Sequence, residues 1–410
     1  MKGFSTKAIH GMRFKKDVHG ALRTPVYDNV AFEYETSRDI QLAFEGKKPG
    51  HSYSRISNPT VDDFEQRVRL ISNAMGVIAV SSGMAAIADV ILTLAETGTN
   101  IVSTKSIFGN TYSLFEHTLK HWGLEVRYVS MNNPEEVEQA IDENTRAVFL
   151  EAMTNPGLEI ADFEAIGAIT KARQVPLIVD STVTTPYLFQ GKKFGVNIEI
   201  LSSTKYISGG ATSVGGLIID HGNFNWKQSP KLVERAKTRG PMALISALRQ
   251  EVYRNMGSCL SAHNAYLQSL GLETLSLRVN QSCANTKQVA EFLDGQDAVV
   301  SVHYPGLKSS PYYELGVKYF GGKGGGILTF DLESQEACFQ FMDALKLIKR
   351  ATNVNDNKTM IIHPYSTIFC EYSAEERLSM GVRPTMIRLS VGIEDLDDLQ
   401  DDIIKGLEAI

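Results

Sequence analysis

Short apolar runs alternate with amphipathic stretches between residues 76 and 220. The runs are rich in valine and isoleucine, whereas the stretches between them repeat apolar residues at helical spacing. This alternation favours the α/β class, with a mostly parallel sheet that is covered by helices on both faces. The predicted strands span residues 76–80, 100–104, 125–129, 147–151, 176–180, 198–201 and 215–220, and the predicted helices span 84–95, 111–121, 134–141 and 162–174.

The two ends of the chain follow other patterns. Residues 1–54 lack strong periodicity and contain Pro25, Pro49 and Gly50, which is typical of an arm rather than of a core element. A helix opens at Asn58-Pro59-Thr60, where Pro59 suits the first helical position. After a long helical pattern at residues 260–293, the chain is predicted to form strands at 299–304, 327–332 and 386–391 and helices at 333–347 and 396–407.

These changes of pattern divide the chain into three parts. We predict an arm at residues 1–55, a large domain at 56–256 and a smaller C-terminal α/β domain at 257–410. A length of 410 residues agrees with more than one lobe, because single cores rarely exceed roughly 250–300 residues.

Composition and charge exclude several classes of protein. The formal net charge of −6, without a basic run, gives no reason to expect nucleic acid or an anionic membrane as a partner. No apolar stretch approaches the ~18–20 residues that span a bilayer, and the N-terminus does not resemble a secretory signal. The four cysteines lie far apart and the nine histidines show no metal-binding spacing. We therefore expect reduced thiols, no metal site and a cytoplasmic location.

The most informative chemistry lies around Lys205 and Asp180. Asp180 ends the apolar run 176–180, and Lys205 follows 25 residues later among hydroxyls and glycines. Pyridoxal phosphate needs an amine that holds its aldehyde and an acid that keeps its ring nitrogen protonated. The hydroxyls of Ser202 and Thr204 are placed to hold its phosphate. A strand-end aspartate followed by a surface lysine explains this pair equally well when it is taken alone.

Three further features add to this picture. The turn 81–86 joins a predicted strand to a helix start, where free backbone N–H groups favour phosphate, although an ordinary glycine turn explains the run better when it stands alone. Arg55 can bind phosphate through two hydrogen bonds and Tyr53 can donate one, or Arg55 is a surface arginine. Arg388 interrupts an apolar strand and needs a carboxylate, from the protein or from an amino-acid substrate.

Taken together, these runs closely resemble the Cys/Met-metabolism family of pyridoxal-phosphate enzymes over essentially the whole chain. The family includes cystathionine γ-synthase, cystathionine γ-lyase, methionine γ-lyase and O-acetylhomoserine sulfhydrylase. The resemblance implies the fold type I architecture and pyridoxal 5′-phosphate as cofactor. The matching runs, in order, are residues 53–60, 82–86, 154–156, 179–182, 202–206, 271–275 and 387–395.

The resemblance also implies a role for each matching residue. Lys205 is expected to be the Schiff-base lysine and the base that moves protons, and Asp180 to pair with the pyridine nitrogen. Catalytic roles are expected for Lys205, Asp180 and Tyr53, and substrate contacts for Arg388, which would grip the α-carboxylate, for Asn353 and for Tyr53. The implied cofactor contacts come from Tyr53, Arg55, Gly83, Met84, Phe108, Asn155, Asp180, Ser202, Thr204 and Lys205.

A shared active site is a further implication of the resemblance. Tyr53 and Arg55 match residues that reach the phosphate of a neighbouring subunit, so the arm is expected to contact that subunit. Each site would then be complete only in a dimer, and the family pattern implies a homotetramer of two such dimers.

Several positions depart from the family pattern. Phe108 stands where a tyrosine usually stacks on the cofactor, so a hydroxyl is lost. Gly210 replaces a frequent histidine, and Asn110 is not the cysteine of methionine γ-lyases. Thr352 stands where members that handle cystathionine often carry glutamate, whereas Asn353 and residues 271–275 look more like the sulfhydrylases. The segment after residue 226 is shorter than in many sulfhydrylases, which weakens this assignment.

The expected activity follows from the leaving group. Acetate needs little help from a general acid, whereas a thiolate benefits from a proton donor such as the tyrosine that Phe108 replaces. We therefore expect O-acetyl-L-homoserine and sulfide to give L-homocysteine and acetate. Methionine γ-lyase or cystathionine γ-synthase activity is the alternative. The sequence leaves open whether sulfur arrives as sulfide, as a small thiol or from a sulfur-carrier protein, and whether the leaving group is acetyl, succinyl or phosphoryl.

Overall fold

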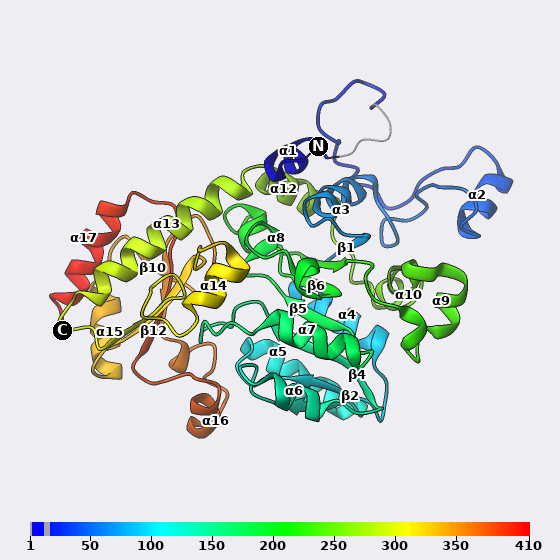
Figure 1. Ribbon diagram of the computed structural model, residues 1–410. Helices are drawn as coiled ribbons and strands as arrows, with labels where there is room; N and C mark the ends of the chain where they lie inside the picture. The colour runs from blue at the N-terminus through cyan, green and yellow to red at the C-terminus, as the bar shows by residue number, and fades with distance from the viewer. Residues whose placement is uncertain (1, 12–16) are drawn as a thin grey trace.

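The computed structural model describes residues 2–11 and 17–410 and contains two separate β-sheets (Figure 1). The larger sheet has the strand order β1-β7-β6-β5-β4-β2-β3, and all neighbouring strands are parallel except β7, which is antiparallel to β1 and β6. The expected mostly parallel sheet is therefore confirmed. Its strands are β1 (Gly76–Val80), β2 (Asn100–Ser103), β3 (Glu125–Tyr128), β4 (Thr145–Glu151), β5 (Leu177–Asp180), β6 (Ile198–Leu201) and β7 (Gly216–Asp220).

Helices cover both faces of this sheet, as its sequence pattern predicts. Successive residues of one strand enter different apolar clusters: Val77 and Ala79 of β1 lie in one, and Ile78 and Val80 lie in the other. Because side chains alternate across a strand, both faces must be buried, which explains the continuous apolar runs. The α-helices of this lobe are α3 (Pro59–Ile71), α4 (Gly83–Leu94), α5 (Gly109–Ser113), α6 (Pro134–Ala140), α7 (Phe163–Ala172), α8 (Thr185–Leu188), α9 (Val233–Arg239), α10 (Ala243–Ala247) and α11 (Tyr253–Met256).

Short 3-10 and π turns connect these elements. The helix predicted at 111–121 is α5 followed by a π turn and a 3-10 turn. The π turns are η1 (Leu114–Leu119) and η7 (Leu248–Val252), and the 3-10 turns are η2 (Lys120–Trp122), η3 (Gly191–Phe194), η4 (Tyr206–Ser208), η5 (Trp226–Gln228), η6 (Gly240–Met242) and η8 (Pro364–Ser366).

The second sheet belongs to the C-terminal lobe and has the order β10-β11-β12-β9-β8. Its apolar cluster is completed by residues from α13, α15 and α17. The long helical pattern at 260–293 is two helices, which meet at Thr274. The elements are α12 (Ala262–Glu273), α13 (Leu275–Asp294), β8 (Ser301–His303), α14 (Tyr313–Phe320), β9 (Ile327–Asp331), α15 (Gln335–Ala344), β10 (Lys349–Arg350), β11 (Met360–Ile362), α16 (Ala374–Ser379), β12 (Met386–Ser390) and α17 (Leu396–Leu407).

Within residues 2–11 and 17–410, no helix combines the length and the apolarity needed to cross a membrane.

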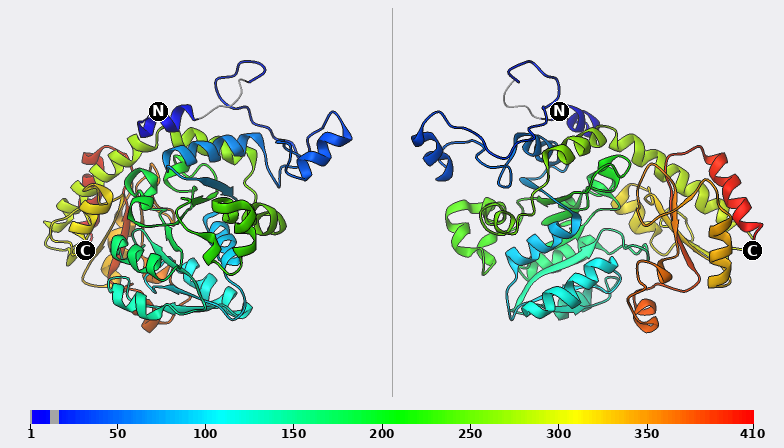
Figure 2. Two further views of the ribbon diagram at one scale, coloured as in Figure 1. Left: turned by 45° about the vertical axis from the view of Figure 1, so that its right-hand side comes forward. Right: turned by 180° about the vertical axis from the view of Figure 1, so that it is seen from behind.

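The N-terminal segment contains two helices that the sequence pattern did not predict. In α1 (Phe4–His10), Ala8 is buried, and the Arg67 side chain of α3 donates hydrogen bonds to the carbonyls of Ala8 and Ile9. By contrast, α2 (Ser37–Phe44) has no buried residue and stands away from the body of the chain (Figure 2). Residues 12–16 of the predicted arm lie outside the described residues.

Candidate active site

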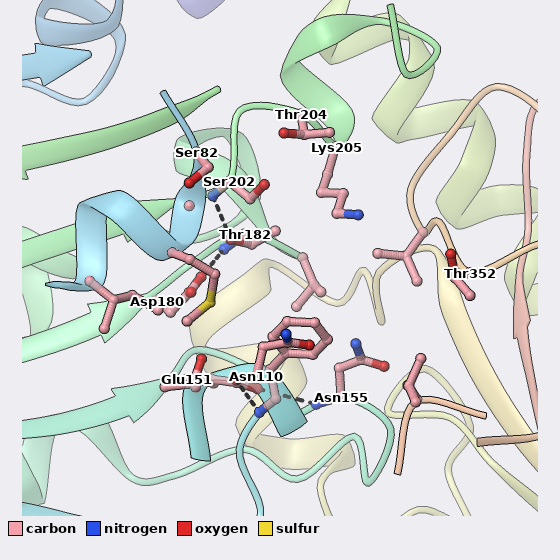
Figure 3. Close-up of a pocket in the computed structure, with 18 of the residues that line it drawn as sticks. Ser82, Asn110, Glu151, Asn155, Asp180, Thr182, Ser202, Thr204, Lys205 and Thr352 are labelled. Carbon is pink, nitrogen blue, oxygen red and sulfur yellow. Dashed lines mark hydrogen bonds between the residues drawn. The ribbon is translucent and has the colours of Figure 1, made fainter. Parts of the chain in front are cut away.

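A cavity of about 450 Å³ lies where β1, β4, β5 and β6 end, beside a loop of the C-terminal lobe (Figure 3). The carboxyl ends of parallel strands are the usual position of ligand sites in such folds. The structure brings nine of the predicted residues to this cavity and places Asn353 against one of them. The nine are Gly83, Met84, Phe108, Asn155, Asp180, Ser202, Thr204, Lys205 and Arg388.

The N-terminus of α4 forms one corner of the cavity. Ser82 caps this helix by accepting a hydrogen bond from the N–H of Ala85, and the first turn leaves further N–H groups without intrahelical acceptors. A Cβ on Gly83 would lie 2.7 Å from the Cβ of Ser202, so only glycine allows this approach of the two turns. The arrangement suits an anion such as phosphate.

The Lys205 side chain points into the cavity and donates a hydrogen bond to Asn353 Oδ1 over 2.6 Å (Figure 3). Burial disfavours its charged form, and the nearby Arg388 guanidinium acts in the same direction. Together they lower the pKa of Lys205 to about 8, against the opposing influence of Asp356. A substantial fraction of this amine is therefore neutral, and nucleophilic, near neutral pH.

Asp180 ends β5 and faces the cavity from the sheet. Its carboxyl accepts a hydrogen bond from the N–H of Thr182 over 2.9 Å. Burial raises the pKa of Asp180 to about 6, and the hydrogen bonds of Thr182 oppose this rise. The group is thus mainly a carboxylate at neutral pH, and it is suited to pair with a buried cation.

Glu151 is a cavity residue that the sequence analysis did not single out. It ends β4 directly beside Asp180 in the sheet register, and its carboxyl accepts hydrogen bonds from the N–H groups of Phe108 and Asn155 over 2.7 and 3.2 Å. Burial and the neighbouring Asp180 hold its pKa well above the usual range. Its place at the end of a predicted strand, as for Asp180, was the signal in the sequence.

Arg388 lies in β12 and is only 2% exposed. It donates hydrogen bonds to Asn155 Oδ1 over 3.1 Å and to the carbonyls of Thr352 and Asn353 over 3.2 and 3.3 Å. Its buried Nε has no partner among the described residues, and burial lowers its pKa to about 9. A cation held in this way favours an anionic ligand in the cavity.

Tyr53 and Arg55 are not part of this cavity. Tyr53 is 42% exposed, and the guanidinium carbon of Arg55 lies 5.4 Å from the centre of the Tyr53 ring. Arg55 also donates a hydrogen bond to the carbonyl of Arg254 over 2.6 Å. Within one chain, these two residues are therefore separate from Lys205.

The positions that depart from the family pattern also have defined places. Phe108 precedes α5 and lines the cavity together with Asn110 and Thr352. Gly210 has a φ of 126°, a conformation that only glycine adopts easily, so a histidine would be strained there.

Comparison with known proteins extends these findings. The family model described as Cys/Met metabolism PLP-dependent enzyme matches residues 5–408. O-acetyl-L-homoserine sulfhydrylase 1 of Thermus thermophilus is 37% identical, over 98% of this chain and 99% of that protein. L-methionine gamma-lyase of Pseudomonas putida is 34% identical, over 100% and 98% of the two chains.

Solved structures of related proteins have the same fold as this chain. A putative O-acetylhomoserine (thiol)-lyase from Campylobacter jejuni superposes with a TM-score of 0.93 at 34% identity, over 99% of this chain and 100% of that one, and it carries N′-pyridoxyl-lysine-5′-monophosphate. An O-acetylhomoserine sulfhydrylase of Wolinella succinogenes is 48% identical, with a TM-score of 0.77 over 85% and 97% of the two chains.

The residues of the cavity fit pyridoxal 5′-phosphate, the cofactor on which that family depends. The partly buried Lys205 would supply an amine for its aldehyde, and Asp180 would supply a carboxylate for its ring nitrogen. The close approach at Gly83 leaves the α4 terminus open to its phosphate.

The lowered pKa of Lys205 predicts how cofactor binding depends on pH. Only the neutral amine attacks an aldehyde, so covalent attachment of pyridoxal 5′-phosphate to the apoprotein should accelerate with rising pH and level off above about 8. Stopped-flow absorbance at a series of pH values measures this rate. The phosphate of the cofactor titrates near pH ~6, so its own change of charge falls below the pH range in which Lys205 loses its proton. Lys205→Ala should show no covalent phase.

The Arg388→Leu variant separates the two causes that lower the pKa of Lys205, which are burial and the charge of Arg388. Loss of the guanidinium charge should move the midpoint for Lys205 to higher pH, because Arg388 lowers the pKa of Lys205. A midpoint in this variant that equals the wild-type value would mean that burial alone sets the pKa of the lysine.

Proposed function

The chain belongs to the Cys/Met metabolism PLP-dependent enzyme family, and we propose that it converts O-acetyl-L-homoserine and sulfide to L-homocysteine and acetate. The observation that carries this proposal is a buried arginine and a partly buried lysine that line one cavity. Arg388 forms no ion pair with a carboxylate of the described residues, and Lys205 has a lowered pKa. An α-amino acid supplies the carboxylate that this site favours. Relatives named as sulfhydrylases support the choice of amino acid and of reaction.

Arg388 is proposed to bind the substrate α-carboxylate. Its guanidinium is held by Asn155 Oδ1 and by the carbonyls of Thr352 and Asn353, so its direction is fixed before the substrate arrives. Charge-assisted hydrogen bonds of this kind are worth about 1.5–3 kcal/mol. Asn353 is proposed to contact both the substrate and Lys205.

Lys205 is proposed to move the protons. The bound cofactor supplies an electron sink that stabilises negative charge at Cα. The Lys205 amine then takes the Cα proton, since a pKa of about 8 suits a base that works near neutral pH. In the overall replacement the Cγ–O bond breaks, acetate leaves with the bonding electrons, and sulfide forms the new Cγ–S bond.

The remaining cavity residues are proposed to hold the cofactor. Asp180 would keep the pyridine nitrogen protonated, Phe108 would contact the ring face, and Asn155 would lie near O3′. The phosphate would be held by the backbone of Gly83 and Met84 and by the hydroxyls of Ser202 and Thr204.

The cavity favours a leaving group that needs no proton. Among the described residues, Glu151, Asp180, Lys205 and Arg388 are the charged or acidic side chains that line it, and no tyrosine or cysteine does. Acetate leaves as a stable anion, whereas a thiolate is more basic and gains from a general acid. Thr352 also provides no carboxylate for the distal amino group of cystathionine, which speaks against cystathionine γ-synthase activity.

Methionine γ-lyase activity is the second candidate. It is favoured by the likeness to the Pseudomonas putida enzyme over the whole chain. In that reaction the substrate loses its thiol without replacement and yields α-ketobutyrate and ammonia.

For the proposed replacement reaction, sulfide is the proposed sulfur donor. A small thiol or a sulfur-carrier protein is the other source.

A second copy of the chain is proposed to complete each active site. The arm exposes apolar side chains, among them Leu22 (93% exposed) and Phe44 (71%), which is typical of a surface that another chain covers. Tyr53 and Arg55 lie at the end of this arm and do not line the cavity of their own chain. We propose that they reach the cofactor phosphate of the neighbouring subunit, and that Tyr53 also contacts substrate there.

The proposed assembly is a cytoplasmic homotetramer of two such dimers. Its chains would be divided into an arm at residues 1–55, a domain that binds the cofactor at 56–256 and a small domain at 257–410. The resemblance to the family and the exposed arm support this division.

A product assay with the purified holoprotein tests the proposed reaction. Homocysteine should form from O-acetyl-L-homoserine only when sulfide is added, and acetate should appear in equal amount. If α-ketobutyrate dominates and sulfide changes little, the γ-lyase reaction replaces the present proposal.

Phe108→Tyr tests the argument about the leaving group. The added hydroxyl should raise elimination from methionine by about tenfold or more, against roughly 10²–10⁴-fold for an optimally placed general acid, and should change acetate elimination by less than about twofold. Steady-state rates with both substrates measure this difference, and Phe108→Leu is the control for a change of side chain without a hydroxyl. Equal effects on the two substrates would contradict the argument.

Mixing two inactive variants tests the shared site. Lys205→Ala and Arg55→Ala homodimers should each be nearly inactive. After subunit exchange, a hybrid dimer has one site with both changes and one with neither, so about a quarter of all sites should recover activity. Activity after exchange measures this recovery. No recovery, with hybrids demonstrated by differently tagged subunits, would mean that Arg55 serves the site of its own chain.

A further inference from the structure

Glu151 lines the cavity, yet the proposed chemistry gives it no part. Only 5% of the residue is exposed, and it ends β4 between the end of β5, which carries Asp180, and the end of β2, which leads to Phe108. A buried acid at the centre of a strand array has a high free-energy cost unless its oxygens are bonded. Its contacts therefore indicate what it does.

The two oxygens of Glu151 bond to two different turns. Oε1 accepts the N–H of Phe108 over 2.7 Å, and Oε2 accepts the N–H of Asn155 over 3.2 Å. Figure 3 shows both contacts as dashed lines at Glu151, between the turn after β2 and the turn after β4. Phe108 precedes α5 without capping it through its side chain, and its N–H contact with Glu151 is one of the hydrogen bonds that hold the start of that short helix.

The contact with Asn155 extends to Arg388. The Asn155 backbone bonds to Glu151, and its side-chain Oδ1 accepts a hydrogen bond from the Arg388 guanidinium over 3.1 Å. A displacement of the Asn155 turn would therefore change the direction of the arginine. One carboxyl group thus connects the ring-facing Phe108 with the residue proposed to bind the α-carboxylate.

The charge of Glu151 is limited by its neighbour. Glu151 and Asp180 are paired across two parallel strands, and the acidic group of each lies in the same buried region. Burial, and after it the repulsion between two carboxyl groups so placed, raises the pKa of Glu151 well above its usual range. Glu151 therefore carries less negative charge than an exposed glutamate would at the same pH.

We propose that Glu151 is a positioning residue of this active site: its carboxyl group holds the Phe108 turn and the Asn155 turn in one arrangement, and through Asn155 it orients Arg388. The effect on Arg388 and the substrate rests on the proposed function. The effect on the Phe108 turn and on cofactor binding does not depend on which substrate is used.

Glu151→Gln is the decisive variant. The glutamine oxygen can keep the shorter contact to Phe108, but its NH₂ group then faces the N–H of Asn155, so this contact is lost. The KM for O-acetyl-L-homoserine should rise about tenfold or more while kcat changes less than about threefold, since the altered interaction is with bound substrate. Glu151→Ala frees both turns and should also reduce the induced circular dichroism of the bound cofactor.

Asp402→Asn is the matched control. Asp402 is also a buried carboxylate (2% exposed) that accepts backbone N–H bonds, from Lys346, Leu347 and Ile348, but it lies on α17 in the C-terminal lobe. Its replacement should lower the thermal midpoint and leave the KM and the cofactor dichroism unchanged. A wild-type KM in Glu151→Gln would overturn the proposal, and so would an equal rise of KM in Asp402→Asn.

The cofactor signals separate this proposal from the proposed reaction. Dichroism at equal cofactor occupancy and the cofactor dissociation constant are measured without substrate. If the product assay favours another amino acid, the KM is measured with that compound instead. Should Glu151→Ala fail to fold, Glu151→Gln still decides, because it preserves the volume and one of the two hydrogen bonds.

Discussion

Removal of charged groups from water is the constraint on which the active site depends. Arg388 and Lys205 lie within one cavity, and burial is the largest influence on the pKa of each. An uncompensated buried charge has an effective free-energy cost of several kcal/mol. For the lysine this cost lowers the pKa to about 8, so that part of the amine is neutral near neutral pH. For the arginine, which stays charged, it produces a strong preference for an anionic ligand. In the proposed mechanism, the basicity of the lysine and the selection of an anionic substrate would thus have one physical origin.

The junction of the two lobes provides this environment. Lys205 follows β6 of the large sheet, whereas Arg388 and Asn353 come from the C-terminal lobe. The amide of Asn353 donates to Asp356 Oδ2 over 3.1 Å, and this contact directs its oxygen toward Lys205. Asp356 also opposes the fall in the lysine pKa. The C-terminal lobe therefore sets both the position and the charge of a lysine that belongs to the other lobe.

The sequence predicted the parts of the site that follow from strand ends. Asp180 and Ser82 come directly after apolar runs, and parallel strands bring such positions together. The same rule applies to Glu151, but its importance depends on backbone N–H groups of distant turns, which no local pattern reveals. The resemblance to the family added Asn155 and Asn353, which lie on loops without periodicity.

Several elements of the fold were not predicted from the sequence because they are very short or depend on contacts with other parts of the chain. Strands β10 and β11 are two and three residues long, too short for an alternating pattern to be recognised. Thr274 separates α12 from α13 without glycine or proline. There the Thr274 hydroxyl donates to the carbonyl of Gly271 and accepts from the Arg278 side chain, and the same guanidinium donates to the carbonyl of Tyr206, which is a tertiary contact. Helix α1 is stabilised by Arg67 from another element, so its own short sequence carries little signal.

The arm links assembly to chemistry. Val18, Leu22, Val30 and Phe44 are each more than half exposed, and several exposed apolar side chains on one segment favour contact with another surface. The same segment continues into Tyr53 and Arg55, whose side chains lie outside the cavity of their own chain. Covering the arm with a neighbouring chain would bury apolar area and, in the same step, bring a guanidinium to a second cavity. A phosphate site at the start of α4 gains most from such a cation, because the helix terminus supplies only partial charge. In the proposed assembly, dimer formation and a complete phosphate site would be two consequences of one docking event.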